Sequence, residues 1–205
     1  MPLSPSKIVC VGRNYREHAR EMGNEVPTEP LLFLKPPSAI IAAGEPIVLH
    51  SVSNHIEFEG EIALVIGKRL QRATEDEARA AISHVVALND VTARDLQKSD
   101  GQWARAKGLD TFCPLGEPAP VPDDLDAITV VTTVNGKECQ RARASDMVFA
   151  IPILLSYISQ YLTLHPGDLV ATGTPAGTKR LNAGDIVEVQ LAGLSSVSNP
   201  VIAGS

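Results

Sequence analysis

The chain has 205 residues, of which 44% are hydrophobic and 20% charged, and its formal net charge is −6. This length and apolar content predict one domain spanning residues 1–205 rather than two domains of ordinary size. The charges are intermixed without a basic block, which excludes the electrostatic surface that nucleic acids or anionic membranes require and favours small-molecule partners.

Short apolar runs between turn signals predict a strand-rich α+β chain. We find no internal repeat and no low-complexity linker in the sequence. The expected strands, in chain order, are residues 8–11, 31–35, 47–49, 56–66, 85–88, 129–134, 169–171 and 186–191.

The middle of the chain contains a helix signal followed by a loop signal. Thr74 and Glu77 have the spacing of a capping box, which predicts a helix over residues 78–82. Residues 116–128 are rich in proline and acidic residues. This composition predicts a surface loop.

A hairpin and a second helix are expected further along the chain. Asn135 and Gly136 both accept a positive φ, so they predict a tight turn after the strand at residues 129–134. Pro152 at a first helical turn opens the apolar segment PILLSYISQYL, which predicts a core helix.

The three cysteines, Cys10, Cys113 and Cys139, are widely spaced and form no CxxC pair. This pattern argues against a disulfide scaffold and against a zinc site. The sequence has neither a signal-peptide pattern nor about 18 consecutive apolar residues. We therefore expect a soluble cytoplasmic protein with no membrane partner.

Two acids precede an apolar run in the segment IEFEGEIALVIGK. Glu59 and Glu61 are two residues apart, so in an extended strand their side chains share a face. The following IALVI is apolar on both faces, as in a covered central strand. Adjacent carboxylates entering such a strand repel each other unless a cation is present. The alternative is a strand end whose acids face water.

A third acid follows another apolar run in VVALNDVTARDLQ. Asp90 would complete a set of three oxygen ligands without His or Cys, which suits Mg²⁺ or Mn²⁺. Alternatively, Asp90 caps the junction between strand and helix. Arg94 and Gln97 follow on one expected helical turn, where Arg94 alone is also compatible with a surface ion pair.

A histidine and a glutamate lie three apart in VGRNYREHAREM. Their spacing places His18 and Glu21 on one face of a helical turn. A carboxylate beside an imidazole fixes its tautomer and raises its basicity, as a general base requires. The alternative is an amphipathic surface helix without catalytic function.

The segments CVGRNYREHAREM, FLKPPSA, EFEGEIALVIGK, LNDVTARDLQ, AKGLDTFCPLG and ATGTPAGT occur in this order along nearly the whole chain. In this combination the chain resembles the fumarylacetoacetate hydrolase family, and most of all its short acylpyruvase and oxaloacetate decarboxylase branch. The resemblance implies a mixed β-sheet roll without a separate N-terminal domain, and a homodimer.

The resemblance also implies roles for particular residues. The metal ligands would be Glu59, Glu61 and Asp90. The catalytic residues would be His18, Glu21 and Lys107, and the substrate contacts would be Arg94, Gln97 and Thr174. One departure is AGTKRLNAGD, where relatives often have a Gly-Pro pair, and it concerns the rim of the pocket.

The implied reaction is cleavage of a C–C bond in a small 2-oxo acid through a metal-stabilised enolate. It would be hydrolysis of an acylpyruvate or decarboxylation of oxaloacetate, with Mg²⁺ or Mn²⁺ as cofactor. One alternative is an isomerase or tautomerase, of the homoprotocatechuate-pathway or oxaloacetate type, that uses the same enolate. Another is a non-catalytic module that binds a metal and an oxo acid, which would not need His18 and Glu21.

Overall fold

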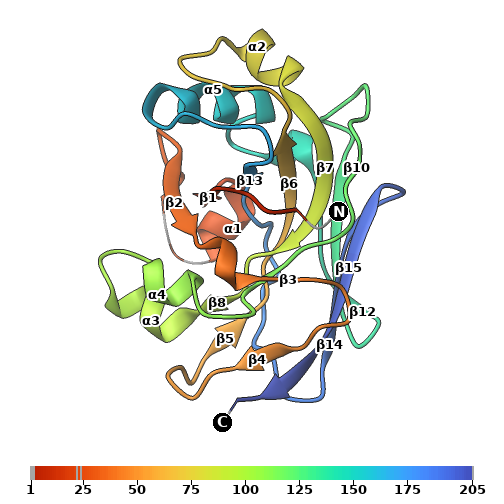
Figure 1. Ribbon diagram of the computed structural model, residues 1–205. Coiled ribbons are helices and arrows are strands. Elements are labelled where there is room, and N and C mark those ends of the chain that lie inside the picture. The colour runs from red at the N-terminus through yellow and green to blue at the C-terminus, as the bar shows by residue number, and fades with distance from the viewer. Residues whose placement is uncertain (1–2, 22, 24, 205) are drawn as a thin grey trace.

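The computed structural model describes residues 3–21, 23 and 25–204, which form two mixed β-sheets with short helices around them (Figure 1). The first sheet has the order β10-β7-β6-β13-β1-β2 and the second β12-β11-β14-β15-β4. The strands of the first sheet are β1 (Ile8–Gly12), β2 (Leu31–Lys35), β6 (Gly60–Ile66), β7 (Ile82–Asn89), β10 (Ala119–Pro120) and β13 (Leu169–Ala171). Those of the second are β4 (Ile47–Leu49), β11 (Thr129–Val134), β12 (Lys137–Arg143), β14 (Ile186–Leu191) and β15 (Ser195–Ala203).

Two short strand pairs complete the β-structure: β3 (Ile40–Ile41) with β9 (Cys113–Pro114), and β5 (Ile56–Glu57) with β8 (Thr92–Ala93). The helices are α1 (Arg16–Glu21), α2 (Glu75–Ala80), α3 (Arg94–Ser99), α4 (Ala104–Lys107) and α5 (Ile151–Tyr161), with 3-10 turns η1 (Pro37–Ala39) and η2 (Ala144–Asp146). The predicted strand-rich α+β class is confirmed.

Strand β6 is buried along its whole length between β7 and β13, as expected for a covered central strand. The continuous strand predicted over residues 56–66 is wrong, because the chain changes partner at residues 58 and 59. β5 pairs with β8, whereas β6 pairs with β7 from the register Gly60↔Asn89 onward. The residues of the break therefore lie between two pairings, and Glu59 is one of them.

The predicted capping box is confirmed, since Thr74 and Glu77 bond each other's backbone at the start of α2. The helix ends at Ala80, however, and Ile82 is the first residue of β7. The prediction of a helix through residue 82 is wrong at this end. The β-branched Ile82 is buried in the main core from its strand position.

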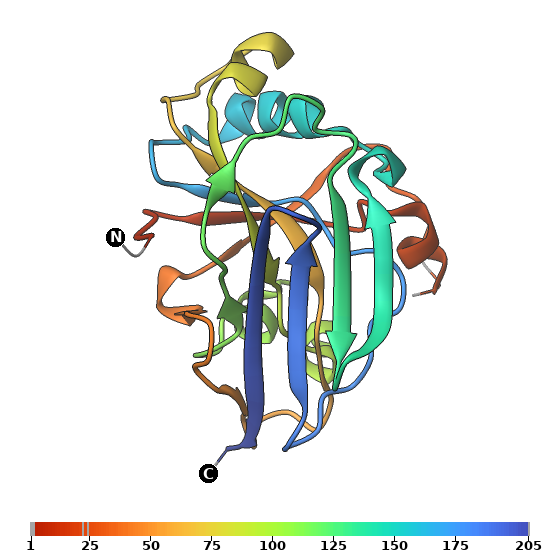
Figure 2. The same ribbon diagram turned by 90° about the vertical axis from the view of Figure 1, so that its right-hand side faces the viewer.

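The predicted hairpin is also confirmed. Asn135 and Gly136 have φ values of 52° and 75°, and β11 and β12 pair antiparallel on either side of them. Figure 2 faces the second sheet, in which the long strands β15, β14, β11 and β12 run side by side.

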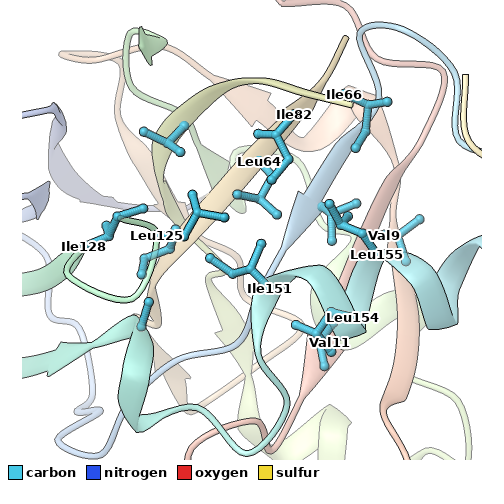
Figure 3. Close-up of a cluster of buried hydrophobic side chains, with 14 of the residues drawn as sticks. Val9, Val11, Leu64, Ile66, Ile82, Leu125, Ile128, Ile151, Leu154 and Leu155 are labelled. Carbon is cyan, nitrogen blue, oxygen red and sulfur yellow. The ribbon is translucent and has the colours of Figure 1, made fainter. Parts of the chain in front are cut away.

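The main hydrophobic core lies between the first sheet, α5 and the chain that leads into β11 (Figure 3). Helix α5, which Pro152 opens as predicted, contributes its apolar face. The prediction of a surface loop over residues 116–128 is partly wrong. This segment contains β10, and Leu125 and Ile128 are 2% and 3% exposed because their side chains close the core. No helix within the described parts of the chain has the length and hydropathy that spanning a membrane would require.

Candidate active site

Three carboxylates converge where β6 and β7 lie side by side. One oxygen from each of Glu59, Glu61 and Asp90 lies within 4.8 Å of the others, and all three side chains are buried. The backbone of Asp90 donates to the carbonyl of Glu59 over 2.8 Å, directly beyond the register pair Gly60↔Asn89. The strand pairing thus brings together acids that are about 30 residues apart in the sequence.

The glycine between the two glutamates is required by close packing. A Cβ on Gly60 would lie 1.9 Å from Oγ1 of Thr132, a buried residue of β11. The backbone N–H of Gly60 donates to Oε1 of Gln140 over 3.0 Å. Strand β6 therefore lies directly against the second sheet at the point where it carries the two acids.

Two cations hold Glu59. Lys107 Nζ lies 2.8 Å from Oε2 of Glu59, and Arg94 Nη1 lies 2.5 Å from Oε1. Burial alone would raise the pKa of Glu59, but the charges of Lys107 and Arg94 outweigh it and keep that pKa below its ordinary value. Glu59 is therefore a carboxylate although its side chain is buried.

Asp90 is also bound by two ammonium groups. Lys107 Nζ lies 2.5 Å from Oδ2 of Asp90 and Lys35 Nζ lies 2.7 Å from Oδ1. The alternative that Asp90 caps a helix is wrong, because the N-cap of α3 is Ala93, which has no side-chain cap bond. Burial would lower the pKa of Lys107, but Asp90 and Glu59 raise it above its ordinary value.

Glu61 differs from the other two acids. Its Oε2 accepts a hydrogen bond of 2.8 Å from the backbone of Gly173, and no ion pair of Glu61 occurs among the described residues. Burial, together with the charges of Asp90 and Glu59, raises its pKa well above the ordinary value. A divalent cation between the three acids would remove this repulsion, and three carboxylate oxygens are a donor set that suits Mg²⁺ or Mn²⁺.

Helix α1 carries the predicted histidine on its inner face. His18 is 6% exposed, and its Nδ1 lies 3.3 Å from Oε2 of Glu21. Both carboxylate oxygens of Glu21 accept from the backbone of Gly177 over 3.1 Å. The helix is amphipathic, but His18 faces inward. The geometry fits an imidazole oriented by the Glu21 carboxylate, which is in turn fixed by the backbone of Gly177.

A pocket of about 370 Å³ opens above the carboxylates. All the predicted site residues line it except Glu21 and Asp90, which contact the lining residues His18 and Lys107 respectively. Arg94 is 3% exposed and donates to Gln97 over 2.8 Å, so the alternative of a surface ion pair is wrong. The roles of these residues in binding and catalysis stay predictions.

The model of the C-terminal domain of fumarylacetoacetate (FAA) hydrolase matches residues 7–202 of the chain. The chain belongs to this family. It is 42% identical over 192 residues to a mitochondrial oxaloacetate tautomerase of Caenorhabditis elegans, covering 91% of this chain and 90% of the relative. It is 38% identical over 202 residues to a 2,4-didehydro-3-deoxy-L-rhamnonate hydrolase of a Sphingomonas species, covering 93% of this chain and 71% of the relative.

A solved structure also matches the fold of this chain closely. The crystal structure of 2-hydroxyhepta-2,4-diene-1,7-dioate isomerase from Mycobacterium marinum superimposes with a TM-score of 0.90 at 42% identity. The match covers 100% of this chain and 77% of that one. The chain thus resembles family members that are named as hydrolases, isomerases and tautomerases.

Two polar residues that support the candidate site were not predicted from the sequence. Lys35 ends the apolar run LLFLK, and it is 1% exposed and pairs with Asp90, which is distant in the sequence. Gln140 bonds Gly60, Thr174 and the carbonyl of Pro175 from β12. Nothing in the sequence near Gln140 distinguishes it from the exposed polar residues of the hairpin.

Proposed function

We propose that the chain is a divalent-cation-dependent enzyme that cleaves a C–C bond of small 2-oxo acids, by hydrolysis of acylpyruvates or decarboxylation of oxaloacetate. The observation that carries the proposal is the convergence of three buried carboxylates beneath a pocket that also holds an imidazole, an ammonium and a guanidinium. A binding module does not need an imidazole held by a carboxylate, so His18 and Glu21 favour turnover.

The cation would be held by Glu59, Glu61 and Asp90, and Mg²⁺ or Mn²⁺ matches these oxygen donors. When bound, it supplies a Lewis acid that polarises the 2-oxo group of the substrate and favours the enolate. Lys35 and Lys107 hold the carboxyl group of Asp90 in position through contacts of 2.7 and 2.5 Å.

The proposed roles of the other groups follow from their positions. His18, with Glu21 at 3.3 Å from its Nδ1, would take a proton from water beside the distal carbonyl of an acylpyruvate. Lys107 and Arg94 would offset the negative charge that develops on oxygen. Loss of CO₂ from oxaloacetate needs no water and would depend less on His18.

A second candidate is an isomerase or tautomerase, and relatives with these names favour it. The same groups would stabilise an enolate, and a proton would return to another atom without C–C cleavage. His18 is again the group that would move the proton. The two candidates therefore share a site and differ in the fate of the enolate.

One experiment separates the candidates. The protein is incubated with acetylpyruvate and with oxaloacetate in the presence of Mg²⁺, while enol absorbance and pyruvate release are followed together. Cleavage predicts pyruvate in step with the loss of enol absorbance. Enol loss without pyruvate identifies a tautomerase, and no change in either substrate contradicts the proposed function for both.

Variants test the roles of individual residues. Glu59→Ala should abolish calorimetrically detected Mg²⁺ or Mn²⁺ binding, whereas the exposed Glu75→Ala on α2 should bind as the parent does. His18→Ala should keep its metal affinity while kcat for acylpyruvates falls by about 10² to 10⁴. The matched control is His84→Ala, an exposed histidine on β7. Parental turnover by His18→Ala would show that another group activates water.

The homodimer implied by the family resemblance is also a proposal. It is supported by the edge position of β2 in the first sheet and by the exposure of Leu31 and Leu34 on that strand, at 37% and 49%. An exposed apolar edge strand is a common site of pairing between chains. Sedimentation equilibrium tests the proposal, and a monomer at all concentrations would contradict it.

A further inference from the structure

Two cations in the pocket wall have no part in the carboxylate cluster. Arg13 lies half-buried in the turn between β1 and α1, and Lys98 lies exposed near the end of α3. Glu61 and Lys107, which line the same pocket, are only 1% exposed. The difference in burial places Arg13 and Lys98 toward the mouth and the carboxylates at the floor.

The pairing of the charges separates these two cations from the others. Arg94, Lys107 and Lys35 each have a carboxylate partner at 2.8 Å or less. Within the described parts of the chain, neither Arg13 nor Lys98 has an ion pair or a side-chain hydrogen bond. The one acid beside them in the wall, Asp100, is bound at both oxygens by Arg105, over 2.6 and 2.7 Å.

Between the floor and the mouth the wall is apolar. The rings of Phe33 and Trp103 meet edge to face with centroids 5.3 Å apart. Trp103 lies against Gly12, where a Cβ would approach its ring to 3.1 Å. The next residue, Arg13, has a φ of 59°, a left-handed conformation that non-glycine residues adopt rarely and that is found disproportionately at functional sites.

We propose that Arg13 and Lys98 form a second anion subsite, which makes the chain selective for 2-oxo acids that carry a second carboxylate. The inference rests on the proposed function, which puts the 2-oxo carboxylate group of the substrate at the floor. The carbon chain lies along Phe33 and Trp103, and the far carboxylate pairs with the guanidinium of Arg13, with Lys98 adding charge at the rim. A guanidinium can bind a carboxylate through two parallel hydrogen bonds.

The first test measures binding and needs no turnover. Calorimetry in the presence of Mg²⁺ compares 2-oxoglutarate, which has a second carboxylate, with pyruvate, which has none. The parent protein should bind 2-oxoglutarate more tightly. Arg13→Gln should lower the affinity for 2-oxoglutarate by about ten- to a hundredfold, which corresponds to the loss of one charged hydrogen-bonded pair. It should lower the affinity for pyruvate much less. Arg13→Lys should recover part of the loss, and Lys98→Gln should produce a smaller one.

The matched control is Arg20→Gln, which removes the same charge from the exposed face of α1. The inference is wrong if Arg20→Gln and Arg13→Gln lose the same affinity for 2-oxoglutarate. It is also wrong if Arg13→Gln lowers the affinity for 2-oxoglutarate and for pyruvate equally, or changes neither affinity. Thermal unfolding verifies that each variant is folded, and Arg13→Lys keeps the test valid should Arg13→Gln not fold.

Kinetics give the second test. Arg13→Gln should lower kcat/KM for fumarylpyruvate, mainly through KM, by at least about ten times more than for acetylpyruvate. Equal losses would overturn the inference. If neither acid is cleaved but 2-oxoglutarate binding keeps its dependence on Arg13, the proposed reaction fails while the subsite stands.

Discussion

Gly60 provides a direct test of how packing positions the metal ligands. A Cβ at this position would lie 1.9 Å from Oγ1 of Thr132, whereas real Cβ atoms essentially never approach closer than 3.0 Å. Thr132 is buried on β11, which is hydrogen-bonded to β12 on one side and to β14 on the other. Because β11 is fixed on both sides, Gly60→Ala must displace β6 by about 1 Å, together with Glu59 and Glu61.

The displacement has two measurable effects. Overpacking should lower the free energy of unfolding by about 1–3 kcal/mol, which urea denaturation measures. Moving Glu59 and Glu61 relative to Asp90 should also weaken Mn²⁺ binding, and a misplacement of this size lowers activity by about 10²-fold. Calorimetry with Mn²⁺ and the pyruvate-release assay measure the two consequences separately.

A second substitution makes the test specific. Thr132→Ala removes the clashing hydroxyl, which has no hydrogen-bond partner in the described region, and leaves the new Cβ 3.2 Å from Cβ of residue 132 and 3.2 Å from Oε1 of Gln140. The double variant Gly60→Ala/Thr132→Ala should therefore regain most of the stability and Mn²⁺ affinity lost by Gly60→Ala. Parental stability and affinity in Gly60→Ala, or the absence of any rescue in the double variant, would refute this reasoning.

Three further predictions concern buried ionisable groups. Asp168→Asn should lower the free energy of unfolding by roughly 2–3 kcal/mol at neutral pH, because the buried carboxylate accepts hydrogen bonds from donors that precede β1 and β13. Burial would raise the pKa of Asp168, but these donors lower it below its ordinary value. The stabilisation is therefore complete above the ordinary carboxyl pKa and disappears as the pH falls through the lowered value. A constant difference between parent and variant in urea titrations at several pH values would contradict this. Lys35→Met should destabilise the fold by roughly 3–5 kcal/mol, since it breaks a fully buried pair with Asp90, and an unchanged urea midpoint would disprove it. Burial raises the pKa of Cys113 to about 12 and also raises that of Cys10, whereas Cys139 is half-buried and outside the pocket lining. A thiol reagent should therefore leave turnover intact, and inactivation with the fold preserved would show that a cysteine is needed.

Local signals in the sequence determined much of the secondary structure. The apolar runs predicted most strands of both sheets, because alternation and β-branched residues act over a few neighbours. The turn at Asn135 and Gly136 and the capping box at Thr74 were predicted for the same reason, since each motif satisfies its own backbone groups. The order of the family's motifs along the chain indicated the family, which the match over residues 7–202 shows.

The sequence also indicated candidate site residues, but the convergence of Glu59, Glu61 and Asp90 is a property of the fold. The register of β6 on β7 brings Asp90 beside Glu59, and this register depends on contacts along the whole sheet. The break between β5 and β6 was missed because the change of pairing partner depends on where β8 and β7 lie in the fold, which residues 56–66 do not show by themselves.

Charge pairing was decided only by the tertiary structure. In the sequence Lys35, Arg13 and Lys98 are three basic residues among intermixed charges, and nothing distinguishes them. In the fold Lys35 is buried against Asp90, whereas Arg13 and Lys98 line the pocket without an acid partner in the described residues. Whether a cation is neutralised depends on distances between segments far apart in the chain, and those distances exist only once the chain has folded.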